Sequence, residues 1–172
     1  MKHKGIRRFF NHLLHTPLHT RKHFPGAVLA RIEAAIKASE RSHLGEVRFV
    51  VEGDLHPLHI LQAITPWQRA IALFSQLRIW DTEQNNGVLI YLLLADRDVE
   101  IVADRGIHRH VGAEAWEEIC KAMEAEFRHG EFERGVLLGL DSISALLRQH
   151  YPAGTDASSP NENELPDAPI VF

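Results

Sequence analysis

Two polar clusters flank the most hydrophobic stretch of this sequence. The first is Asp-Thr-Glu-Gln-Asn-Asn at residues 81–86, and the second is Asp-Arg-Gly at residues 104–106. Carboxylate and amide oxygens are the ligands that Ca²⁺ and Mg²⁺ prefer, and an arginine suits a phosphate or a carboxylate. If the clusters meet in space, they predict a polar site for a divalent cation or a partner loop. Its metal ligands would be Asp81, Glu83 and Asp104. Its other binding residues would be Asn85, Asn86, Arg105 and Gly106.

The same residues have a purely structural interpretation. Asn and Asp turn a chain through hydrogen bonds to their own backbone. Gly87 and Gly106 would relieve backbone strain, and Asp104 would pair with Arg105 on the surface. The residues alone leave both interpretations open.

The elements between the clusters predict that they do meet. Residues from Gly87 to Ala95 are apolar without a break, which is typical of a central strand buried on both faces. Asp96–Asp98 would form a turn, and Val99–Ala103 would return as an antiparallel neighbour. Asn85 and Asn86 would then lie across from Arg105 and Gly106.

The other elements predict the fold class. Val47, Phe49 and Val51 alternate with charged residues, which indicates a strand covered mainly on one face. Helices are predicted after Pro25, after Thr65, over a segment that Gly130 ends, and over about 131–150. The helix after Thr65 would bury Trp67, Ile71, Phe74 and Leu77. The helix that ends before Gly130 would bury Trp116, Ile119, Cys120, Met123 and Phe127. Gly135 and Gly139 would let the last helix approach its neighbours closely. The order predicts an α/β fold, a small mixed sheet covered by helices on both faces, with its first two strands parallel.

The length and hydrophobic content, 172 residues and 45%, suit a single globular domain. We expect a basic arm at 1–23, the α/β domain at 24–152 and a Pro/Ser/Asn-rich tail at 153–172, whose last residues would dock as an extended strip. Cys120 is the sole cysteine, so no intrachain disulfide is expected.

The arm carries six Lys or Arg and no acidic residue, while the rest of the chain has a net charge of -10. Two interpretations of the arm stay open. It packs on the acidic body, or it contacts an anionic membrane surface or a protein partner. Its five histidines are irregularly spaced and lack the other ligands of a zinc site.

Several functions are disfavoured. No phosphate loop, nucleophile elbow or cysteine pair is present, and the basic residues lack a reading helix or stacking platform for nucleic acid. No stretch is apolar enough for a transmembrane helix, and the start lacks the features of a signal peptide. The expected location is therefore cytoplasmic, with peripheral membrane contact if the arm provides it. His108 and His110 would lie beside Asp104 on an extended segment, without a complete zinc set.

Three stretches resemble the TPM domain family, which is named for a thylakoid lumen protein, a photosystem II accessory protein and a nematode receptor modulator. They are GEVRFVVE, LRIWDTEQNNGVLIYLLLADRDVEIVADRGI and FRHGEFERGVLLGLDSISALL. The resemblance runs from about Gly45 to Pro152. The arm and the closing NELPDAPIVF are similar to a bacterial cytosolic branch. The positions that match the family motif are Asp81, Asn85, Asn86, Gly87, Asp104, Arg105 and Gly106.

The resemblance implies two functions. One is a non-catalytic binding or assembly module acting near membranes or membrane-protein complexes, since some relatives bind calcium in loops at one sheet edge. The other is a weak metal-assisted acid phosphatase for phosphate monoesters, as credited to plastid members. In it, Asp81 or Asp104 would hold the metal, and Arg105 would neutralise the phosphoryl oxygens. Ca²⁺ or Mg²⁺ would be the cofactor. Exported relatives have a glycine-rich GxG where this chain has Asp104-Arg105-Gly106, which weakens the carry-over of calcium binding. We favour the binding module, because no residue has the pattern of an activated nucleophile.

Overall fold

The computed structural model describes His12, residues 17–154 and residues 163–172. These residues build a four-stranded sheet with the strand order β3-β2-β1-β4. The strands are β1 (Val47–Glu52), β2 (Val88–Leu93), β3 (Asp98–Ala103) and β4 (Ile170–Val171). β1 is parallel to β2 and to β4, and β3 is antiparallel to β2. The predicted parallel first pair and the hairpin are confirmed, and the terminal segment docks as expected, with Ile170 beside Val50.

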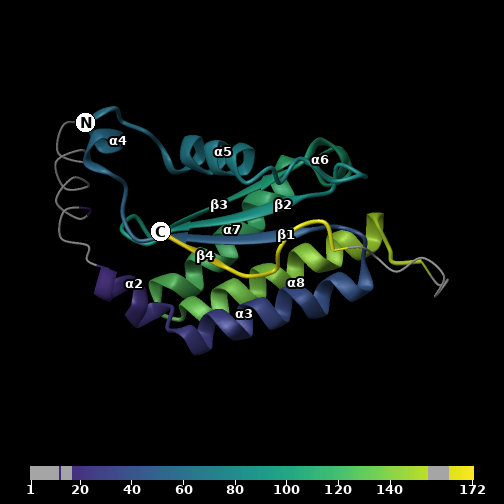
Figure 1. The fold of residues 1–172 in the computed structure, drawn as a ribbon, viewed down its shortest axis with the longest axis horizontal. Coiled ribbons are helices and arrows are strands. Elements are labelled where there is room, and N and C mark those ends of the chain that lie inside the picture. Colours follow the sequence, from purple (N-terminus) through teal and green to yellow (C-terminus); the bar gives the residue numbers. More distant parts are fainter. Residues whose placement is uncertain (1–11, 13–16, 155–162) are drawn as a thin grey trace.

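Helices cover both faces of this sheet, as predicted (Figure 1). The helices are α2 (Pro17–His23), α3 (Gly26–Ser39), α4 (Pro57–Leu61), α5 (Pro66–Gln76), α6 (Arg105–Val111), α7 (Ala113–Arg128) and α8 (Phe132–His150), with a 3-10 turn η1 (Glu40–Ser42). α3, α7 and α8 contribute to the core on one face, the first face, and α5 covers the other, the second face. No helix among the described residues is both long and apolar enough to cross a bilayer.

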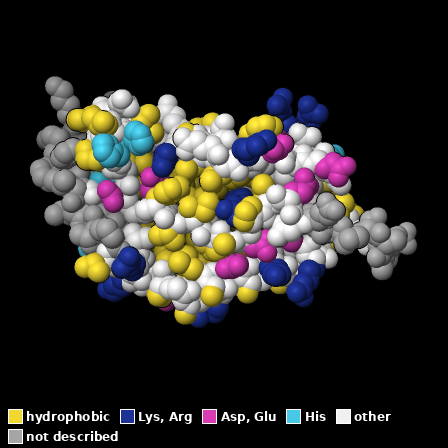
Figure 2. Space-filling model, in the orientation of Figure 1, with side chains coloured by type: hydrophobic (Ala, Val, Ile, Leu, Met, Phe, Trp, Pro, Cys, Tyr) yellow, Lys and Arg dark blue, Asp and Glu magenta, His cyan; other side chains and the backbone are white. Residues whose placement is uncertain are grey.

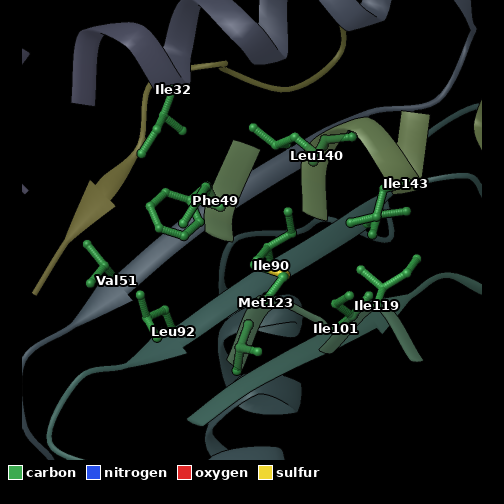
Figure 3. Close-up of a cluster of buried hydrophobic side chains, with 14 of the residues drawn as sticks. Ile32, Phe49, Val51, Ile90, Leu92, Ile101, Ile119, Met123, Leu140 and Ile143 are labelled. Atoms are coloured by element: carbon green, nitrogen blue, oxygen red, sulfur yellow. The ribbon is translucent and has the colours of Figure 1, made fainter. Parts of the chain in front are cut away.

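The core on the first face consists mainly of hydrophobic side chains, although α8 also buries Ser144. Figure 3 shows Phe49 and Ile90 of the strands pointing toward side chains of α7 and α8 such as Met123 and Leu140. Phe49, Ile90, Met123 and Leu140 are each at most 1% exposed. This burial removes the side chains from water and supplies the main driving force for the fold.

The α7–α8 contact depends on two glycines, as the sequence predicts. A methyl group at Gly135 would collide with the Phe127 ring, and one at Gly139 would collide with the Met123 side chain. Both glycines are buried. The helices can therefore pack closely because neither position carries a side chain.

The second face differs from the sequence prediction in two ways. All six residues of β1 are buried, so the strand is covered on both faces. On α5, Trp67 and Ile71 are each 45% exposed, and the buried positions are Ala70 and Leu73.

One salt bridge accounts for the burial of Glu52 and for the orientation of α5. Arg69 of α5 donates from Nε and Nη2 to the two carboxylate oxygens of Glu52 at the end of β1, at 2.9 Å each. The hydroxyl of Tyr91 also donates to Glu52, at 2.7 Å. A buried charge needs such partners. The side of α5 that bears Arg69 therefore faces the sheet, and Trp67 and Ile71 turn outward.

Candidate functional site

The two polar clusters meet at one end of the sheet, as the hairpin prediction requires. The N–H of Asp104 donates to the carbonyl of Gly87 at 2.9 Å, and the N–H of Ile107 donates to the carbonyl of Asn85 at 3.3 Å. The hairpin turn lies slightly earlier than predicted, since Asp98 is already in β3. The ends of the hydrophobic stretch are thus neighbours in space.

Gly106 is required for this approach. A Cβ atom at position 106 would collide with the carbonyl oxygens of Gln84 and Asn85 and with the hydroxyl of Tyr151. Tyr151 follows the last turn of α8. The site is therefore assembled from three parts of the chain: the loop before β2, the start of α6 and the end of α8.

The loop before β2 is shaped by its own polar groups. Thr82 accepts a hydrogen bond from the N–H of Asn86 at its hydroxyl, 3.1 Å away, and Asn85 has a φ of 52°. Asparagine tolerates this left-handed conformation better than most residues. The Asn86 side chain is fully buried and donates from Nδ2 to the carbonyl of Leu44 at 2.8 Å. This amide joins the loop to the segment that leads into β1.

Asp104 caps α6. Its Oδ1 accepts a hydrogen bond from the N–H of Arg105 at 2.6 Å, and the residue is 6% exposed. An acidic cap is favourable because the start of a helix has unpaired N–H groups and a partial positive charge. The Tyr151 pKa is raised, first by burial and then by the negative charge of Asp104. The carboxylate therefore acts on both the helix and the tyrosine.

Two buried oxygen atoms in this region have no hydrogen-bond partner among the described residues: Oδ1 of Asn86 and Oδ2 of Asp104. A buried polar atom without a partner costs about 1–3 kcal/mol. Such atoms are rare in folded proteins, and each needs an explanation such as a bound water or ion. Both are acceptor oxygens, which suit a hard cation.

The other predicted site residues lie on the surface. Asp81 pairs with Arg78 at 2.6 Å, with both side chains at least half exposed. Glu83 is exposed, and its main-chain N–H donates to Glu164. Arg105 is exposed at the start of α6. In the part of the chain that the structure describes, no three His, Cys, Asp or Glu side chains gather to hold a metal ion.

The segment with His108 and His110 is helical rather than extended, because Asp104 starts a helix there. His110 stacks on His150 of α8, and neither histidine belongs to a group of three possible metal ligands among the described residues. Cys120 is largely buried, and burial raises the pKa of its thiol to about 12. It is therefore not a thiolate nucleophile near neutral pH.

The sequence did not predict a further polar cluster, at Glu40 and Glu46. Glu40 and Glu46 line a pocket of about 320 Å³ together with Asp167 of the terminal segment. Burial raises the pKa of Glu40 to about 8 and also raises that of Glu46. Glu46 accepts hydrogen bonds from the N–H groups of Glu164 and Leu165. No local pattern connects position 46 with position 164, so only the fold reveals this contact. Figure 2 shows the surface of the molecule in the orientation of Figure 1. Acidic side chains gather on the side toward α6, and hydrophobic side chains lie over the middle, between α5 and β4.

Comparisons with known proteins agree with this architecture. A family model described as the TPM domain matches residues 22–146, well over half of the chain. The chain belongs to the TPM domain family. Similar solved structures include the NMR structure of the BA42 protein from the psychrophilic bacterium Bizionia argentinensis sp. nov. The identity is 27% and the TM-score 0.73, and the match covers 85% of this chain and 93% of that one.

A more distant structure is the NMR structure of the N-terminal domain of a protein from P. gingivalis. It is 19% identical with a TM-score of 0.59, and the match covers 75% of this chain and 81% of that one. At this identity the match shows a shared fold alone. The comparison with curated proteins gave no match.

Proposed function

We propose that this TPM domain is a non-catalytic binding module that takes a divalent cation at the end of the sheet where Asn86 and Asp104 lie. The observation that carries the proposal is the pair of buried oxygens, Asn86 Oδ1 and Asp104 Oδ2, without a hydrogen-bond partner among the described residues. A cation would supply the missing interaction. Ca²⁺ suits an irregular loop site better than Mg²⁺, because it accepts six to eight oxygen ligands in flexible geometry.

Two side-chain oxygens would not complete such a set. Main-chain carbonyls, water and the loop carboxylates of Asp81 and Glu83 are the proposed remaining ligands, with Asp81 leaving its exposed pair with Arg78. Asn85, Arg105 and Gly106 would contact a partner loop or anion at the rim. The cation would connect the loop before β2 to the start of α6 and so stiffen the surface offered to a partner.

A titration with Ca²⁺ followed by amide NMR shifts tests this proposal. We expect shifts in residues 81–87 and 104–110 that Asp104→Asn removes. Asparagine is a good helix cap, so this variant keeps α6 and removes the charge. Asp141→Asn on the exposed side of α8 is the matched control. Unchanged spectra up to millimolar Ca²⁺ and Mg²⁺ would contradict the proposal.

The alternative, a metal-assisted phosphatase, is favoured by one feature, the exposed Arg105 directly after Asp104. Arginine would neutralise the phosphoryl oxygens. Asp104 would hold the metal through Oδ2, since Oδ1 caps α6. Hydrolysis of p-nitrophenyl phosphate that survives repurification and disappears in both Asp104→Ala and Arg105→Ala would favour this enzyme over the binding module.

Association with an anionic membrane is proposed for the basic arm. Its residues Lys2–Arg8 lie outside the described residues. The described part contacts the body: His12 Nδ1 accepts from the N–H of Leu55 at 2.9 Å, and Nε2 lies 3.2 Å from Asp96. Co-sedimentation with phosphatidylserine vesicles tests the arm. Equal binding by the chain and by a variant with Lys2, Lys4, Arg7 and Arg8 replaced by Gln would contradict this role.

A further inference from the structure

The outer edge of β3 has the main-chain geometry of a strand-docking site. In the part of the chain that the structure describes, β3 is the last strand on its side of the sheet. The N–H of Asp104 bonds to Gly87, and hydrogen-bonded pairs alternate along an antiparallel ladder. Val99, Ile101 and Ala103 therefore direct their N–H and C=O groups away from β2. The outward main chain of Ile101 is hydrogen-bonded to the Cys120 thiol of α7, so an added strand would replace this bond at the centre of the edge.

A groove runs along this edge. Its volume is about 720 Å³, and all six residues of β3 line it. Trp67 of α5 lines one side, and Trp116 and Cys120 of α7 line another part. A strand of six residues is about 20 Å long. The groove runs along all of β3, so an added strand of the same length would fit in it.

The groove also offers an apolar anchor. Trp67, which lines the groove, is 45% exposed. Ile71, one turn further along α5 and outside the lining, is equally exposed. Tryptophan is enriched among the interface residues that dominate binding energy. The rotation of α5 that places Arg69 on Glu52 is what leaves these two side chains outside the core.

The charge of the groove selects the partner. Asp98, Glu100, Glu117 and Glu124 line it, together with Lys121. Lys121 pairs with Glu117, and Arg128 pairs with Glu124, which leaves the groove net acidic. Burial, followed by the charges of Asp98 and Glu124, raises the pKa of Glu100 to about 7, so an incoming cation would relieve a crowded acidic site. A second copy of this chain fits less well, because pairing β3 with itself would bring acidic strands together.

We propose that the β3 edge binds an extended segment of a partner protein in which lysine or arginine alternates with apolar residues, and that this segment adds a fifth strand beside β3. Main-chain hydrogen bonds would supply affinity, and Trp67 and the acidic residues would supply selectivity. This surface is separate from the proposed cation site and goes beyond the proposed function.

A capped hexapeptide that alternates lysine with valine is the probe. We expect amide shifts in β3 and a change in tryptophan fluorescence. Trp67→Ala should weaken binding about tenfold, while Trp80→Ala, equally exposed but outside the groove, should leave it unchanged. Glu100→Gln should weaken binding severalfold and reduce its salt dependence, with Glu114→Gln on the exposed side of α7 as control.

Main-chain pairing has its own test. One set of alternate amide groups in an added strand faces β3 and the other faces away. Of two probe peptides with N-methyl groups on complementary sets, we expect one to bind and the other to fail. Binding of both, or equal binding of a peptide with glutamate in place of lysine, would overturn the proposal. Self-association of the protein that Trp67→Ala abolishes would also overturn it, in favour of a second copy.

Discussion

The two faces of the sheet are buried by different chemistry. The first face, under α3, α7 and α8, carries the larger apolar core. The second face, under α5 and the terminal segment, has a smaller apolar cluster and buries charged groups beside it, among them Arg48 and Glu52. In β1, Val47, Phe49 and Val51 belong to the first core, whereas Arg48 and Glu52 alternate with them.

This difference separates two sources of stability. Apolar packing on the first face depends on shape and area and is insensitive to pH. The second face depends on partners for its charges, because a buried charge stabilises the fold only when its hydrogen bonds are satisfied. Substitutions on the two faces should therefore destabilise the fold for different reasons.

The largest effect should come from the first face. Ile90→Ala removes a fully buried side chain from the middle of β2 and should lower the free energy of unfolding by about 3–4 kcal/mol. Urea denaturation followed by circular dichroism measures this loss. Ile90→Val is the control and should cost about 1 kcal/mol. A loss below about 1.5 kcal/mol for the alanine variant would mean that the core collapses around the cavity and is not tightly packed.

The next largest effect should come from the charged network of the second face. Glu52→Leu leaves the guanidinium of Arg69 and the hydroxyl of Tyr91 without their acceptor, and we expect a loss of about 3 kcal/mol. The double variant Glu52→Leu with Arg69→Met should recover most of this loss, because it removes both charges. The same denaturation experiment tests both. A double variant as unstable as the single one would show that the salt bridge itself stabilises the fold.

The first face could be predicted from sequence because its signals are local. Trp116, Met123 and Phe127 recur at helical spacing, and the unbroken apolar run from Val88 to Leu93 indicates a strand covered on both sides. The meeting of Asn85 with Gly106 followed from a single short hairpin. These predictions needed no knowledge of distant contacts.

The second face could not be predicted in this way. The charged residues of β1 predicted an exposed face of the strand. Nothing in the sequence indicates that Arg69, 17 positions after Glu52, would cover Glu52. The helical stripe at Trp67 and Ile71 indicated burial for the same reason. At the candidate site, the sequence supplied Asn86 and Asp104 but not the hydroxyl of Tyr151 or the cluster at Glu40, which depend on contacts between distant segments.

A moderate effect should come from pH, because the stability of the folded chain should depend on the protonation of Glu40. Burial raises the pKa of Glu40 to about 8 from 4.5, so between these values the folded chain holds a proton that the unfolded chain releases. The stability linked to this proton is fully present below pH 4.5 and is lost as pH rises through about 8. Glu40→Gln imitates the protonated form and can still accept from the N–H of Val47.

Thermal unfolding at a series of pH values tests this linkage. At pH 8 the Glu40→Gln variant should exceed the parent chain by on the order of 2 kcal/mol, and at pH 5 the two should be nearly equal. The exposed Glu33→Gln on α3 is the control. Parallel pH profiles for Glu40→Gln and the parent would show that Glu40 is ionised in the folded chain.

The smallest effect concerns how α5 is held on the second face. Its buried residues are only Ala70 and Leu73, so local capping should contribute a larger share of its stability than in α7 or α8. Thr65 accepts from the N–H of Gln68 at 3.1 Å, and Gln68 accepts from the N–H of Thr65 at 3.0 Å. Thr65→Ala removes half of this capping box and should cost about 1 kcal/mol, whereas Thr65→Ser should cost much less.

Hydrogen exchange shows whether that loss is local. If the second face opens separately, Thr65→Ala should speed exchange of the α5 amides and leave those of α7 and α8 unchanged, because local opening needs less free energy than global unfolding. Equal acceleration in all three helices would mean that the two faces unfold together. The polar face would then be as firmly coupled to the fold as the apolar one, despite its different chemistry.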